Sequence, residues 1–125
     1  MHWLAVAVGG ALGAMARYGV SSIIFNPSSQ KFPWATMSVN VLGSFVMGML
    51  FVIIVEKGAL PAEMRSLLMV GFLGAFTTFS TFSLDALGLW QNGHLLLALV
   101  YALGTVVLCL AAISIAVWLT RLFLI

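Results

Sequence analysis

The residues with the most unusual chemistry lie in the stretch GAFTTFSTFSLD, residues 74–85. Eight consecutive positions hold five hydroxyl residues and three phenylalanines: Phe76, Thr77, Thr78, Phe79, Ser80, Thr81, Phe82 and Ser83. Hydroxyls and freed backbone amides can bind anions, whereas freed backbone carbonyls can bind cations. A phenyl ring has a positive edge that can face a small anion without supplying a full charge. These residue types favour an ion-binding segment.

A straight helix does not account for this stretch. It would line up Phe76, Phe79 and Phe82 on one face, as in an ordinary core, but would also place hydroxyls around most of its circumference. We therefore predict a broken helix, with the break at Gly74 to Thr77. Freed backbone groups inside a membrane are tolerated only where they are buried or line a cavity.

Two other polar side chains lie in apolar stretches. Arg17, in GAMAR, either reaches toward the nearby interface or places a positive charge at the mouth of an aqueous vestibule. Asn40, in SVNVLGS, lies one helical turn after Thr36. Its carboxamide either joins two helices or donates a hydrogen bond to an anion in place of water.

A third polar feature is the spacing of Tyr101, Thr105 and Cys109, which would form one stripe down an aliphatic helix. Threonine and cysteine can bond back to their own helix, so the stripe either does so or lines an ion path.

The composition indicates that these residues lie within a membrane. The chain has 125 residues, of which 63% are hydrophobic and 6% charged, and its mean hydropathy is +1.20. Soluble domains contain about 25% charged residues, and a short chain cannot bury so much apolar surface. The sequence therefore predicts an integral membrane protein with a single domain over residues 1–125. Its net charge of +2 is too small and too scattered to indicate a nucleic-acid partner.

Four apolar stretches are long enough to cross a bilayer as helices, and they predict an all-α membrane protein. The predicted spans cover about residues 3–25, 35–55, 66–90 and 95–119. Both termini and the loop at 56–65 would then lie on one side of the membrane.

Basic residues usually set the orientation of such a chain. The side with the termini carries Lys57, Arg65 and Arg121, and the other side carries Lys31, with Arg17 near it. This bias is weak, so insertion in both orientations and insertion in one both remain open.

Small residues also recur at helical spacing. Gly9 with Gly13, and Ser44 with Gly48, form small-xxx-small pairs, which allow close helix packing within one subunit. Four thin helices enclose little space, so we expect a homo-oligomer.

The chain resembles the CrcB/Fluc fluoride channels of microorganisms over essentially its whole length. The resemblance is carried by GAMAR in the first span, NVLGS in the second and GFLGAFTTFSTFS in the third. It implies an antiparallel, dual-topology homodimer with two pores in the lipid bilayer. Such a multi-pass protein of the cell membrane (plasma or inner membrane) would export fluoride passively and lower cytoplasmic fluoride.

The resemblance also implies a role for each matching residue. The anion pore would be lined by Asn40, Phe79, Thr81, Phe82, Tyr101 and Thr105. Arg17 would be the vestibule cation. Backbone carbonyls of Gly74 and Thr77, from both subunits, would hold a structural sodium ion at the dimer interface.

Two positions depart from the family pattern. Asp85 stands where the family often has glutamate, and Cys109 stands where a hydroxyl residue is expected. The sequence assigns a role to neither.

Three other classes of protein share some features of this sequence. A small proton-coupled multidrug transporter is also short and four-spanning, but it needs a carboxylate in its first span, where this chain has no Asp or Glu. A membrane interaction protein would use the polar residues as helix glue, which does not require phenylalanines within a hydroxyl run. An enzyme is not expected, because no nucleophile–base pair or metal cluster is visible.

Overall fold

The computed structural model describes residues 1–24 and 32–124, and within them every regular element is helical. Four helical stretches are long and apolar enough to cross a membrane: His2–Ile24, Trp34–Glu56, Ala62–Gln91 and Leu95–Phe123. This confirms the prediction of an all-helical, multi-pass membrane protein with four spans. Phe25, the predicted end of the first span, and Lys31 lie outside the described residues.

The second and third stretches consist of several elements. The elements in chain order are α1 (His2–Ile24), α2 (Trp34–Leu50), the π-helical η1 (Phe51–Glu56), α3 (Ala62–Arg65), the π-helical η2 (Ser66–Leu73), α4 (Gly74–Phe76), α5 (Ser80–Gln91) and α6 (Leu95–Phe123). Between α4 and α5, the backbone at Thr77 is extended, with φ −88° and ψ 159°.

The predicted loop at 56–65 is too long. The second stretch continues through Glu56, and helix resumes at Ala62. Pro61 directly precedes α3, and proline is tolerated at a helix start because the first amides have no intrahelical partner. Glu63 lies in the first turn of α3, where the positive end of the helix dipole stabilises a carboxylate.

The last span is also longer than predicted, and it ends at Phe123. Arg121 in its last turn donates to both carboxylate oxygens of Glu56, with Nε 2.9 Å from Oε1. This ion pair links the end of α6 to the end of η1.

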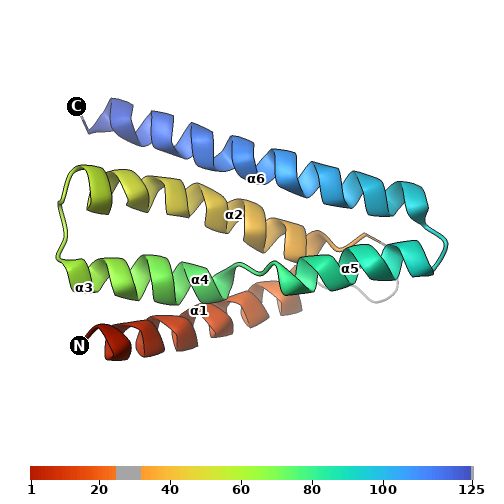
Figure 1. The fold of residues 1–125 in the computed structure, drawn as a ribbon, viewed down its shortest axis with the longest axis horizontal. Coiled ribbons are helices and arrows are strands. Elements are labelled where there is room, and N and C mark those ends of the chain that lie inside the picture. Colours follow the sequence, from red (N-terminus) through yellow and green to blue (C-terminus); the bar gives the residue numbers. More distant parts are fainter. Residues whose placement is uncertain (25–31, 125) are drawn as a thin grey trace.

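Figure 1 shows α6 beside α2, and α1 beside the line formed by α3, η2 and α4, with both termini and α3 at the same end of the molecule. One buried cluster joins α2, α5 and α6 through residues such as Met37, Phe82 and Tyr101. A second joins α2 to η2 and α4 through Val39, Leu73 and Phe76. Most other large apolar side chains point outward, as lipid-facing residues do.

Glycines bring the backbones of α1 and η2 into direct contact. A methyl group at Gly9 would meet the carbonyl oxygen of Leu67, and one at Gly13 would meet that of Phe72. In span two, Gly48 lies against Ile113 and Ala116 of α6. These glycines therefore allow helices of one subunit to pack closely. Close packing matters in lipid, because no hydrophobic driving force holds the helices together there.

We expect Gly13→Ala to lower the free energy of unfolding by about 1–3 kcal/mol, because the new methyl group must displace the backbone of η2. Gly19→Ala on the same helix is the matched control, since a methyl group there meets no atom within 4 Å and alanine favours helix by up to about 1 kcal/mol. Thermal unfolding of the purified proteins in detergent measures both. Equal stability of the two variants would contradict this packing.

Candidate functional site

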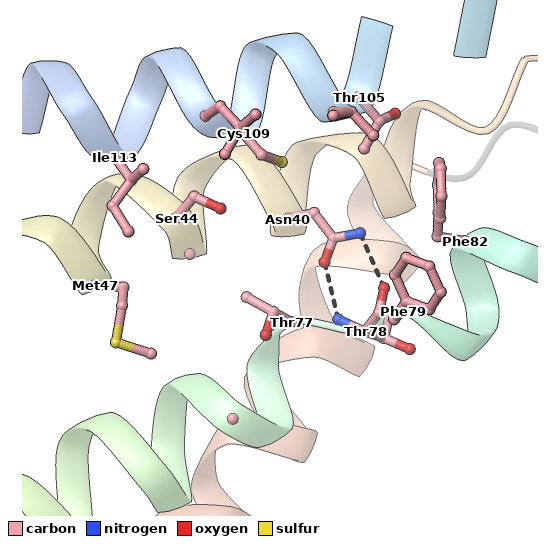
Figure 2. A pocket seen from close by; sticks show the side chains of 14 residues that line it. Asn40, Ser44, Met47, Thr77, Thr78, Phe79, Phe82, Thr105, Cys109 and Ile113 are labelled. Carbon is pink, nitrogen blue, oxygen red and sulfur yellow. Dashed lines mark hydrogen bonds between the residues drawn. The ribbon is translucent and has the colours of Figure 1, made fainter. Parts of the chain in front are cut away.

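The break between α4 and α5 is held by a side chain from another span. Asn40 of α2 accepts a hydrogen bond from the Thr78 amide (N to Oδ1, 2.8 Å) and donates one to the Thr78 carbonyl (Nδ2 to O, 3.0 Å). Figure 2 shows the carboxamide lying directly against the backbone of Thr78. Asn40 is buried, at 9% exposure. Through these two hydrogen bonds, its side chain replaces the helical partners that the Thr78 backbone lacks.

A second side chain begins the helix after the break. The Thr78 hydroxyl accepts a hydrogen bond from the Thr81 amide (N to Oγ1, 3.2 Å). This contact between residues i and i+3 is typical of a capping threonine, whose oxygen satisfies a free amide in the first turn.

The carbonyls from Leu73 to Ala75, where η2 passes into α4, differ in their hydrogen-bond partners. The Leu73 carbonyl accepts from both the amide and the hydroxyl of Thr77, at 3.0 and 2.9 Å. The Ala75 carbonyl accepts from Nε of Arg17 at 3.0 Å. The donor that would reach Gly74 in a continuous helix is the Thr78 amide, which Asn40 has taken.

A cavity of about 480 Å³ adjoins the break. Its lining includes seven of the residues that the resemblance singles out or questions: Asn40, Gly74, Thr77, Phe79, Phe82, Thr105 and Cys109. The rings of Phe79 and Phe82 lie at its edge with centroids 5.5 Å apart. Phe82 is buried, whereas Phe79 is 77% exposed, which leaves a large aromatic ring without cover in a single chain.

Thr105 carries the clearest unmet hydrogen-bonding capacity. Its residue is 5% exposed, and its hydroxyl oxygen has no hydrogen-bond partner within the part of the chain that the structure describes. Thr105 and Cys109 both line the cavity from α6, as Figure 2 shows. A buried polar atom without a partner calls for an explanation, such as a bound ion or water.

Three predicted site residues lie outside the cavity lining. Tyr101 is fully buried against Phe82, and its hydroxyl donates to Oδ2 of Asp85 at 3.2 Å. Thr81 is half-buried in the first turn of α5. Arg17 is half-buried and reaches the end of α4. The roles assigned to these three residues stay predictions.

Sequence reasoning missed two partners. It left Thr78 as one hydroxyl among five, although a threonine three residues before a new helical turn is a capping signal. It also assigned no contact to Asp85, which the structure pairs with Tyr101 across the contact between α5 and α6.

Comparison with known proteins matches this chain to one family over most of its length. A family model described as CrcB-like protein, Camphor Resistance (CrcB), matches residues 4–117. A fluoride-specific ion channel FluC of Saccharophagus degradans is 58% identical over 119 residues, which cover 95% of this chain and 89% of the relative. A protein of the same name from Hahella chejuensis is 54% identical over 123 residues, which cover 98% and 97%.

A third relative of that name, from Magnetococcus marinus, is 50% identical over 107 residues, which cover 86% of this chain and 87% of the relative. All three carry the name of an ion channel and not of an enzyme, which agrees with the prediction made from the sequence. With a family model matching residues 4–117 and relatives at least half identical over most of their length, the resemblance is confirmed, and the chain belongs to the CrcB-like protein family.

Proposed function

We propose that this protein is a fluoride-selective channel that lets fluoride leave the cell passively. The observation that carries the proposal is the cavity beside the break, where two phenylalanine rings and a buried carboxamide meet the Thr105 hydroxyl, which has no partner among the described residues. The names of the relatives, each a fluoride-specific ion channel, support the choice of ion.

The lining groups suit a small anion that must lose its water. Nδ2 of Asn40 has two hydrogens, and its bond to Thr78 uses one, so the other can donate to fluoride. The edges of Phe79 and Phe82 offer partial positive charge. Thr105 offers a hydroxyl that no other group in residues 1–24 and 32–124 occupies. These neutral groups bind an anion weakly enough to release it, as conduction requires.

Other predicted residues would extend this path. Thr81 and Tyr101 would continue the polar track, although Tyr101 must first release its bond to Asp85. Arg17 would attract anions into the vestibule, since one of its nitrogens bonds Ala75 while the guanidinium keeps its charge.

We propose that two copies assemble as an antiparallel homodimer and that the third span crosses the membrane as a broken helix. The exposed ring of Phe79 and the open cavity beside it give a second copy a surface to cover. The weak charge bias of the sequence supports insertion in both orientations. The dimer would reside in the plasma or inner membrane.

We also propose a structural sodium ion at the dimer interface, held by the Gly74 and Thr77 carbonyls of both copies. Oxygen ligands suit such a hard cation. The Gly74 carbonyl lacks its usual helical donor and its residue lines the cavity, as does Thr77. The ion would supply positive charge that compensates the carbonyl dipoles at the break.

The multidrug transporter is not favoured by this structure. Proton-coupled exchange needs a carboxylate in the first span, and α1 contains no acidic residue. Asp85 lies in α5 and accepts a hydrogen bond from Tyr101.

Efflux from liposomes tests the channel. Purified protein in fluoride-loaded liposomes should dissipate the fluoride gradient without nucleotide or a proton gradient, while chloride-loaded liposomes keep their content. Ion-selective electrodes record both. Equal loss of chloride, or fluoride loss that stops when the proton gradient is removed, would refute a passive fluoride channel.

Replacing the rings tests the anion path. Phe79→Ile and Phe82→Ile should each slow fluoride efflux by about two- to tenfold, because an aromatic edge contributes about 0.5–1.5 kcal/mol. Phe123→Ile is the matched control, since Phe123 is 83% exposed at the far end of α6. Gel filtration should show the same assembly for all three variants. Wild-type efflux from both ring variants would mean that the rings serve packing alone.

A further inference from the structure

Two neighbouring amides at the break are occupied by side chains instead of carbonyls. The Thr78 amide donates to Oδ1 of Asn40 at 2.8 Å, and the Thr81 amide donates to Oγ1 of Thr78 at 3.2 Å. In a continuous helix each amide would donate to the carbonyl four residues earlier. Those two carbonyls belong to Gly74 and Thr77.

Two carbonyls close to these have hydrogen-bond partners. Leu73 receives two hydrogen bonds from Thr77, and Ala75 receives one from Arg17. Thr77 and Arg17 thus satisfy two of the neighbouring carbonyls. The amides that a continuous helix would direct to Gly74 and Thr77 bond to side chains instead.

We propose that Asn40 and Thr78 are positioning residues for the cation site: by capping the amides of Thr78 and Thr81, they keep the carbonyls of Gly74 and Thr77 free to bind a cation. This inference rests on the sodium site proposed above. It assigns Thr78 a task that depends on its hydroxyl, and it gives Asn40 a second task beside the anion path.

The physical reason lies in the surroundings of the break. A backbone carbonyl without a partner is costly where water is scarce, and the α4 carboxyl end carries partial negative charge. If the Thr78 hydroxyl were absent, the Thr81 amide could turn back to the Thr77 carbonyl, and the helix would close over one ligand. The cap therefore prevents a competing hydrogen bond inside the protein.

The test is Thr78→Val, which keeps the shape of the side chain and removes only the hydroxyl. We expect the sodium affinity of the Thr78→Val protein to fall by about tenfold. This corresponds to about 1.4 kcal/mol, which lies within the cost of leaving a buried hydrogen-bonding group unsatisfied. Thr78→Ser should retain the affinity, because its hydroxyl can still cap Thr81. Ser83→Ala is the matched control, since the Ser83 hydroxyl donates to its own helix, at the Phe79 carbonyl.

The readout is binding and not transport. The unfolding temperature of each purified protein is measured as sodium chloride replaces N-methyl-D-glucamine chloride at constant ionic strength. A ligand that binds only the folded state raises this temperature as its concentration exceeds its dissociation constant. Thr78→Val should need about tenfold more sodium for the same rise. The same sodium dependence in Thr78→Val and the wild type would overturn the inference.

Amide hydrogen exchange in the wild-type dimer provides a second test, which stands even if Thr78→Val fails to fold. The amides of Thr78 and Thr81 should exchange slowly both with and without sodium, since side chains hold them in either case. Rapid exchange of these amides in sodium would overturn the inference.

The outcomes separate this inference from the proposed function. Sodium-dependent stabilisation that needs about tenfold more sodium in Thr78→Val supports the positioning role even if liposomes release no fluoride. In that case the channel proposal alone fails. If the wild type releases fluoride but sodium does not stabilise it more than N-methyl-D-glucamine, the channel stands and the positioning role is overturned.

Discussion

The pair of hydrogen bonds between Asn40 and the backbone of Thr78 is the contact on which the rest of the site depends. A transmembrane helix normally satisfies its own amides and carbonyls, and a break leaves both kinds of group without partners. One buried carboxamide supplies a donor and an acceptor at the same residue, as a neighbouring strand would. The break can therefore exist in apolar surroundings, and the ring of Phe79 and the hydroxyl of Thr105 reach a shared cavity.

The glycine contacts between α1 and η2 position the other side of the break. Because Gly9 and Gly13 lack side chains, α1 approaches the backbone of η2 closely. Arg17 lies one helical turn beyond Gly13 on α1 and donates to the Ala75 carbonyl. The same contact places a positive charge at the negative end of α4, which is favourable for the helix dipole. Packing and electrostatics thus act together at this helix end.

The candidate site shows both the reach and the limit of sequence reasoning. The hydroxyl and phenylalanine run, Asn40 and Thr105 were identified because polar groups in an apolar span are costly and need a reason. Tyr101 was placed on the same stripe as Thr105, yet its hydroxyl turns to Asp85. Helical spacing indicates on which face of a helix a residue lies, but not which group its side chain contacts. The sequence therefore predicted no contacts for Asp85 and Thr78.

The sequence by itself determined the membrane class, the four spans and the types of residue available for binding ions, because hydropathy and length act along the chain. Only the tertiary structure decided which side chains hold the backbone groups at the break. Asn40 and Thr78 are 38 residues apart, and Arg17 and Ala75 are 58 apart. Such contacts form when helices pack, and a choice of hydrogen-bond partner depends on ångström-scale distances that no spacing in the sequence encodes.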